Sequence, residues 1–313
     1  MRREQCGGWT RFVALAVACF FGAGGAAAEE RKGFYLSSGM GIHAAPGIYL
    51  VGHGNDRASR CDEFINPRYA EVEGCTTADR GSGDGWRTSF DSARGLFAGA
   101  ALGYDFGGRL RVEAEYFHRD SKYDQSAPVG SATGATFAKL GGEIQVAEER
   151  INSVTSDSVF ANLYVDFGGS GRWSPYVGVG VGLGATEIDY GTLWARNTDP
   201  EAITTAAGLP NEEEVRRNLA GTVTSEATTL DDDLTGYQVI AGLNYALGEH
   251  VSLDFEARWT DFDGFYSLDE DGWRRLRSHP SQLRLDGSEP VSYWIETEDT
   301  DIRVVSVSLR YDF

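Results

Sequence analysis

Methionine, proline and basic residues are scarce in this chain, and long apolar runs are missing. The 313 residues contain two methionines and eight prolines, and beyond residue 30 no stretch of about 18 apolar residues occurs, which excludes a membrane-spanning helix there. Lys and Arg number 28 against 47 Asp and Glu, a formal charge of −19. Nucleic acid and heparin need basic surfaces, so they are not expected as partners. No P-loop, dinucleotide or zinc motif is present, and we expect neither cofactor nor metal.

The first 28 residues have the layout of a cleaved secretory signal. Arg2 and Arg3 supply a positive start, residues 12–21 are apolar, and three alanines at 26–28 suit a signal peptidase. We therefore expect export through the general secretory pathway, a signal peptide over 1–28 and a mature domain over 29–313. A lipoprotein acylated at Cys19 is the alternative.

Two cysteines, Cys61 and Cys75, remain after the signal, and both lie in one polar segment. In an oxidising compartment we expect them to form a disulfide, which closes a loop of about 15 residues and contributes about 3 kcal/mol in the chain-entropy model. Two free thiols are the alternative. Metal ligation is not favoured, because only His53 lies near them in the sequence.

Eight segments alternate apolar and polar residues with a period of two, the pattern of half-buried β-strands. They span residues 33–42, 94–106, 110–116, 157–167, 175–188, 237–247, 251–259 and 305–313. The abundant glycine (40 residues) and the aromatic content of 12% also fit strands that face lipid on one side.

The lengths of the connections alternate between short and long. Three are tight turns, such as Gly107-Gly108, and four are long, covering about 43–93, 120–156, 189–233 and 264–300. Short turns on one side and long loops on the other are typical of a membrane barrel, whereas a soluble sandwich would not sort its loops by length. The sequence predicts an all-β fold: an eight-stranded antiparallel transmembrane β-barrel of the outer-membrane type, with four long extracellular loops.

The apolar face of each strand is expected to point at lipid, because the opposite face is small or charged. Aromatic residues then gather near both rims, as headgroup contact requires. Near the turns these are Tyr104, Phe106, Phe167, Tyr245, Tyr311 and Phe313, and near the long loops they are Tyr116 and Trp259.

The inward residues indicate whether such a barrel conducts. Eight strands enclose a space that side chains can fill. The predicted interior network contains Arg111, Glu113, Glu115, Asp254, Glu256, Arg258 and Arg310. Both signs are present, which favours a plug of paired charges. We also expect Phe160 and Tyr164 to cover the glycines of strand 175–188. The alternative is a narrow cation path lined by Glu113, Glu115 and Glu256.

Acidic runs dominate the long loops, at 212–214, 231–233, 269–271 and 296–301. They are interpreted as solvated faces, or as surfaces that divalent cations bridge to lipopolysaccharide phosphates or that bind basic partners. Arg274, Arg275 and Arg277 form one basic cluster, a candidate contact for lipid phosphates or a partner. Asn211 followed by 212–219 and Gly221 predicts one short helix.

A catalytic site is not predicted. The best candidate is His118 with Asp120 and Ser121, but Ser121 points to the opposite strand face from the other two. Without a nucleophile beside a base and an acid, hydrolysis has no starting arrangement, so we expect no enzyme activity.

Four segments carry a family resemblance: residues 33–36 (GFYL), 159–167 (VFANLYVDF), 174–184 (SPYVGVGVGLG) and 305–313. The chain resembles the small outer-membrane β-barrel family, of the opacity-protein and rickettsial surface-antigen type. The resemblance implies a surface protein in the outer membrane and an assembly signal at Tyr311 and Phe313. It further implies contact with the barrel assembly machinery and with periplasmic chaperones. The function predicted is a closed scaffold whose loops meet a host, extracellular or envelope partner; the alternative is a small cation-preferring channel.

Overall fold

The structure is a computed structural model that describes residues 32–54, 61, 66–75, 85–132, 140, 142–168, 171–276 and 288–313. The expected signal peptide lies outside these residues. The strands are β1 (Lys32–Ala45), β2 (Tyr49–Gly54), β3 (Gly85–Ser89), β4 (Ala93–Phe106), β5 (Leu110–Pro128), β6 (Ser131–Ala132), β7 (Ile144–Asp166), β8 (Trp173–Arg196), β9 (Val223–Ala246), β10 (Val251–Phe262), β11 (Tyr266–Leu276), β12 (Ser288–Thr297) and β13 (Thr300–Asp312). The helices are the short η2 (Tyr69–Glu71) and η3 (Pro200–Ala202) and the α-helix α3 (Glu212–Leu219). Within the described ranges, no helix is long and apolar enough to span a membrane.

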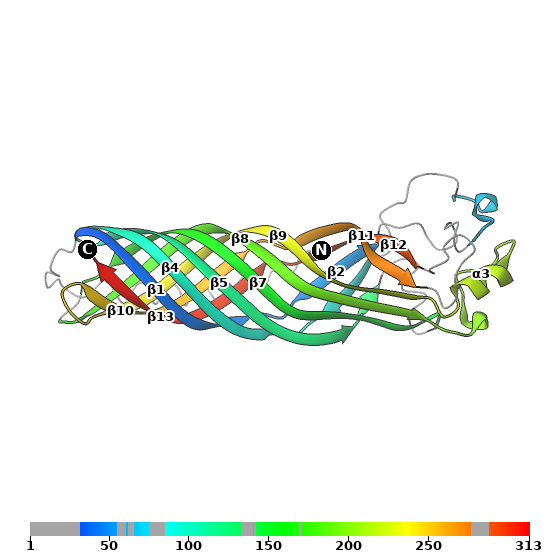
Figure 1. Cartoon of the computed structure of the whole chain (residues 1–313), viewed down its shortest axis with the longest axis horizontal. Coiled ribbons are helices and arrows are strands. Elements are labelled where there is room, and N and C mark those ends of the chain that lie inside the picture. The colour runs from blue at the N-terminus through cyan, green and yellow to red at the C-terminus, as the bar shows by residue number, and fades with distance from the viewer. Residues whose placement is uncertain are drawn as a thin grey trace, which may run out of the picture.

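Eight antiparallel strands close into a ring around the half of the molecule that holds the C-terminus (Figure 1). Their order is β1-β4-β5-β7-β8-β9-β10-β13, and β13 pairs again with β1. Every neighbour is antiparallel, and three connections are short turns. We call this half the lower ring. It contains all eight strands that the sequence predicts.

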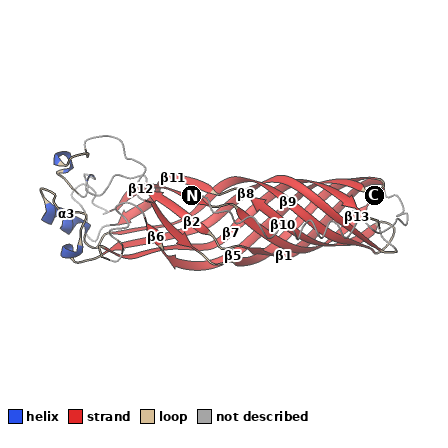
Figure 2. Cartoon of the chain, turned by 180° about the vertical axis from the view of Figure 1, so that it is seen from behind, coloured by secondary structure: helices blue, strands red, loops and turns tan. Residues whose placement is uncertain are grey.

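The segments expected as long loops continue the barrel as a second ring, which we call the tower. The long strands β5, β7, β8 and β9 run through both halves, while β11, β12, β2 and β3 occupy the remaining places between β9 and the end of β5 (Figures 1 and 2). β3 closes the ring on β6 and on Gly130, just past β5. Connections shorter than expected therefore join strands longer than expected.

Four short breaks, at 46–48, 90–92, 263–265 and 298–299, mark the boundary between the lower ring and the tower. The breaks face each other in pairs: Ile48 and Phe90 exchange two backbone hydrogen bonds, and Thr297 N donates to Phe265 O. A Cβ atom on Gly47 would lie 2.5 Å from Phe90 O, and one on Gly264 would lie 2.6 Å from Thr297 O. Glycine is required there because the opposite backbone comes too close for a side chain.

The outer surface of the lower ring carries a continuous apolar belt. Its exposed side chains include Phe34, Met40, Ile42, Leu96, Leu102, Val159, Leu163, Val179, Val181, Leu183, Phe255, Val305, Val307 and Leu309. Further along the same outward faces the residues become polar, for example Asp120 and Lys122 on β5 and Glu187 and Asp189 on β8. A strand needs about 10 residues to cross a bilayer. β8 and β9 have 24 residues each, so the belt accounts for the lower ring and the tower projects beyond it.

Aromatic contacts surround the end of the belt near the turns. Phe34 meets Tyr104 at 4.9 Å between ring centroids, and Tyr311 meets Phe313 at 5.3 Å. Trp173, which the sequence analysis did not include, packs on Tyr245 at 4.4 Å. These amphipathic rings lie where lipid headgroups would meet the barrel.

Candidate functional site

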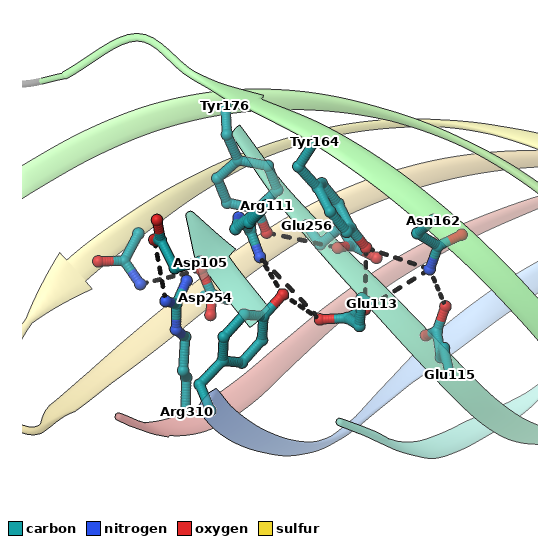
Figure 3. A network of polar contacts seen from close by, with 12 residues as sticks. Asp105, Arg111, Glu113, Glu115, Asn162, Tyr164, Tyr176, Asp254, Glu256 and Arg310 are labelled. Atoms are coloured by element: carbon teal, nitrogen blue, oxygen red, sulfur yellow. Dashed lines mark hydrogen bonds and ion pairs between the residues drawn. The ribbon is translucent and has the colours of Figure 1, made fainter. Parts of the chain in front are cut away.

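A polar network fills the inside of the lower ring (Figure 3). Arg111 lies at its centre: Nε donates to Asp166 at 3.1 Å, and Nη1 donates to the hydroxyl of Tyr35 at 3.2 Å. Its guanidinium stacks over the rings of Tyr164 and Tyr176, at 4.0 and 4.4 Å from the centroids. The planar cation thus has both charged and aromatic partners, which suits a buried arginine.

Tyrosine hydroxyls and arginines supply the donors for the buried carboxylates. Tyr35 and Tyr164 donate to the two oxygens of Glu113 at 3.0 and 3.1 Å. Arg258 Nη2 bridges Glu115 and Glu256 at 2.7 and 2.6 Å. Such pairing offsets the desolvation that isolated buried charges would suffer.

A second arginine, Arg310, completes the network near the turns. It donates to Asp312 at 2.7 Å and lies 3.6 Å from Asp105, and its guanidinium packs over Tyr35 at 3.8 Å. Asn244 donates to Asp254 at 3.0 Å on the neighbouring wall. All seven residues of the predicted interior network are therefore inside the barrel and buried.

Four phenylalanines close the lumen directly beyond this network. Phe97, Phe117, Phe160 and Phe262 come from β4, β5, β7 and β10, and successive ring centroids are 5.3, 5.4 and 5.9 Å apart. We call them the phenylalanine layer. A small cavity of about 30 Å³ lies beneath it, bordered by Phe97 and Arg258 among others, and is large enough to hold water.

Aromatic rings also cover the inward glycines, as the sequence predicts. A Cβ atom on Gly178 would lie 2.5 Å from the ring of Tyr164, and one on Gly182 would lie 2.5 Å from the ring of Phe160. Tyr176 covers Gly242 in the same way, at 2.2 Å. The glycines make room for rings that fill the lumen.

The tower has an apolar interior that is continuous with the phenylalanine layer. Its buried side chains include Leu50, Trp86, Ile151, Ile188, Tyr190, Leu230, Tyr293 and Ile295. One carboxyl group lies among them: Glu149 accepts hydrogen bonds from Trp86 Nε1 at 2.6 Å and from the Tyr190 hydroxyl at 2.7 Å. Burial raises the pKa of Glu149 because removal from water disfavours the carboxylate, and hydrogen bonds from these neutral donors offset this only in part.

A folded cap, residues 197–222, covers the far end of the tower. Its small core consists of Ile203, Ala206, Val215, Leu219 and Ala220. Helix α3 forms as predicted, although the side chain of Asn211 donates to the Glu214 side chain and does not accept from a helix N–H group.

Glu143, which is fully buried, fastens this cap to the barrel wall. Its carboxylate accepts from Arg196 Nε at 2.8 Å and from the backbone N–H groups of Thr204 and Thr205 at 3.0 and 2.8 Å. The hydroxyls of both threonines donate to it as well. One side chain therefore satisfies several donors of a segment that begins more than 50 residues later.

The proposed triad residues do not come together. His118 Nδ1 faces Asp157 Oδ1 at 2.9 Å on the exposed outer surface, and Tyr116 donates to the same oxygen at 2.6 Å. Ser121 points inward and lies 2.7 Å from His43 Nε2. Similar pairs occur elsewhere at this rim, where Tyr237 donates to Asp261 at 2.6 Å. These contacts anchor rim aromatics to the neighbouring strand.

The remaining predicted residues occupy separate places. Cys61 and Cys75 are joined by a disulfide. Arg274 and Arg275 lie on β11, paired with β12 and β9, and Arg277 lies outside the described residues. Tyr311 and Phe313 are exposed at the end near the turns.

Sequence reasoning missed the buried polar residues of the tower and its boundary. Glu143, Glu149 and Arg119 fell in segments expected as solvated loops or beside the rim. The one signal of a further strand is the alternation of Ile188, Tyr190 and Trp194 in residues 185–195, opposite Glu149; it gives no indication of Glu143 or Arg119.

Comparison with known proteins places the chain among outer-membrane barrels. The family model described as "Outer membrane protein beta-barrel domain" matches residues 12–313. No curated protein sequence is significantly similar to the chain.

Several solved structures match most of the chain at low sequence identity. Neisserial surface protein A is 13% identical, with 90% of this chain and 97% of that chain covered and a TM-score of 0.38. The outer membrane protein OprG from Pseudomonas aeruginosa is 11% identical, with 91% and 99% covered and a TM-score of 0.40. The outer membrane protease OmpT from Escherichia coli is 8% identical, with 89% and 97% covered and a TM-score of 0.33. Because the family model spans nearly the whole sequence, the chain belongs to the outer membrane protein β-barrel domain family.

Proposed function

We propose that this protein is a closed scaffold of the bacterial outer membrane that carries a binding surface on its extracellular tower. The supporting observation is the filled interior. A charged network, the phenylalanine layer and the apolar core of the tower follow one another along the barrel axis. A path for ions or solutes would have to displace all three, so the function lies on the outer surface.

The tower and its cap are the part best suited to meet a partner. Loops on a rigid scaffold commonly carry binding residues, and here the cap is held by Glu143 at the end of the molecule away from the belt. Exposed acidic side chains on α3, such as Glu213, give the cap a negative face. Arg274 and Arg275, near the end of β11 beside Ser225 and Thr224 of β9, stand far from the belt, which favours a partner contact over lipid phosphates. A host or extracellular ligand, or a neighbouring envelope component, is the expected partner class.

Biogenesis is proposed to follow the usual route for such barrels. The signal peptide would direct export through the general secretory pathway, and periplasmic chaperones would deliver the chain. The exposed Tyr311 and Phe313 at the end of β13 would contact the barrel assembly machinery. Lipid and lipopolysaccharide would then surround the belt.

Planar-bilayer recording tests the closed interior. Refolded protein should give no reproducible conductance steps, because the phenylalanine layer blocks the lumen. Steady openings that change in Glu113→Gln or Glu256→Gln would contradict the closed scaffold and establish the cation channel instead.

Surface display tests the binding role. Cells that display the whole protein should bind a panel of host cells, matrix proteins and serum proteins more strongly than cells displaying a barrel without residues 197–222. Equal binding by the two, with equal surface amounts, would contradict a role for the cap.

A further inference from the structure

Arg119, on β5, is a buried arginine that has no counter-ion among the described residues. Its side chain is 5% exposed. Among the described residues, no acceptor lies within hydrogen-bonding distance of its Nε or Nη1 atoms. Within the part of the chain that the structure describes, no ion pair forms there either, in contrast to Arg111, Arg258 and Arg310 lower in the barrel.

Among the described residues, the surroundings of Arg119 offer aromatic faces but no carboxylate that pairs with it. Its guanidinium lies 4.8 Å from the ring centre of Phe262 and 5.9 Å from that of Phe117. The ionisable groups that interact with it are Arg258, Tyr123 and His43, and the Tyr123 hydroxyl already donates to Pro46 O at 2.9 Å. A cation over an aromatic ring is stabilised, but burial of an unpaired ion costs more than such a contact returns. The rings alone therefore do not balance the charge.

A second free donor comes from Arg258. Its Nε and Nη2 atoms donate to Glu256 and Glu115, but its buried Nη1 has no acceptor among the described residues. The Arg258 guanidinium lies 5.2 Å from the ring centre of Phe117. Both cations thus contact the same phenylalanine.

The guanidinium groups of Arg119 and Arg258 both contact the ring of Phe117, and each has N–H donors without an acceptor among the described residues. Together they form a site for an anion. The phenylalanine layer leaves little space, so the partner must be small. We propose that Arg119 and Arg258 hold a monoatomic anion of the halide class inside the barrel, where the polar network meets the phenylalanine layer. The anion is enclosed when the ring closes and acts as the missing counter-ion of Arg119.

Unfolding by urea in lipid vesicles tests the site without adding an anionic denaturant. At equal ionic strength, the protein should have a higher urea midpoint in sodium chloride or bromide than in sodium gluconate, because an ion bound only by the folded state stabilises it. In Arg119→Leu the difference should vanish, since an apolar side chain fits among the rings and needs no counter-ion. Arg303→Leu, which changes an exposed arginine paired with Asp301 outside the barrel, should keep the difference.

Crystals grown in bromide give a direct second measurement on the unaltered protein. An anomalous peak between the Arg119 and Arg258 guanidiniums is the expected result. The proposal is overturned if the midpoint is the same in all three salts, if Arg303→Leu loses the salt effect as Arg119→Leu does, or if the bromide peak is missing and only water occupies that place.

Discussion

Two buried glutamates of the tower, Glu143 and Glu149, have different hydrogen-bond partners. These partners determine whether each carboxyl group is stabilised in its charged form. Glu143 has an arginine and four threonine donors, so its charge is stabilised where it is. Glu149 has only neutral donors within a core of aromatic and aliphatic side chains. Glu143 holds the cap to the barrel wall as an anion, whereas Glu149 is harder to ionise than an exposed glutamate.

Replacement of Glu143 by glutamine should release the cap. The amide would turn an NH₂ group towards N–H donors and would remove the partner of Arg196, a loss of about 2–3 kcal/mol from the attachment of residues 197–222. Hydrogen exchange should then be faster in the cap than in the lower ring. Glu213→Gln, at an exposed position of α3, is the control. Unchanged protection in Glu143→Gln would show that the cap is held by its own small core.

The stability of the tower should fall between acidic and neutral pH because of Glu149. Its pKa is raised in the folded state, whereas in an unfolded chain a glutamate has a pKa of about 4.3. The folded state therefore binds the proton more tightly, so this stabilisation is complete below about pH 4 and is lost as pH rises through the folded-state pKa.

Hydrogen exchange of tower amides, corrected for intrinsic rates, measures this loss from pH 4 to 7. Glu149→Gln should protect the tower equally across the range. Glu148→Gln, which alters the neighbouring exposed carboxyl, should behave like the unaltered protein. Parallel pH profiles for Glu149→Gln and the unaltered protein would rule out the assignment.

At the scale of strands and turns, the lower ring could be predicted and the tower could not. Strand alternation is uninterrupted across the belt, because one face meets lipid and the other meets the interior. Towards the tower, bulges between Lys122 and Gln125 and between Ile151 and Val154 shift that alternation, and the four breaks end it. Each bulge or break shifts the phase of the period-two pattern. For this reason the strands of the tower resembled polar loops in the sequence.

Some residues of the candidate site could likewise be predicted from the sequence, and others could not. The interior network follows directly from alternation along the predicted strands, as Arg111, Glu113 and Glu115 illustrate. Glu143, by contrast, depends on Thr204 and Thr205, which lie 61 and 62 residues away in the sequence. No local pattern encodes such a pairing.

A methyl group at Gly264 should weaken the boundary between the lower ring and the tower. The new Cβ would meet Thr297 O at 2.6 Å, and such overpacking typically costs about 1–3 kcal/mol. Protease cleavage within the tower, compared with the unaltered protein, measures the effect of Gly264→Ala. Gly248→Ala places a Cβ in open space and is the matched control; equal cleavage of both variants would argue against a tight boundary.

At the scale of the whole molecule, the apolar belt fixes how the barrel stands in the membrane. The belt covers the lower ring, and exposed polar side chains take over on the same outward faces of β5, β8 and β9. The tower is therefore assigned to the aqueous side, with its apolar residues turned inward.

An arginine placed on each part of the surface tests this boundary. Val181→Arg, in the middle of the belt on β8, should destabilise the barrel in vesicles by about 2–4 kcal/mol, because lipid cannot solvate the charge. Thr229→Arg, on the outward face of β9 in the tower, should leave the urea midpoint nearly unchanged. A large loss in Thr229→Arg, or none in Val181→Arg, would move the membrane boundary.

The meeting of β2 with β12 has a consequence for the order of assembly. Residues 50–54 pair with 293–297 in the tower, just as β1 pairs with β13 below, so both rings are sealed along one line by the earliest and latest parts of the chain. A barrel that inserts with this seam open must carry the tower across the membrane unsealed. We therefore expect β2 and β12 to pair last, after the hairpin of β11 and β12 has crossed the membrane.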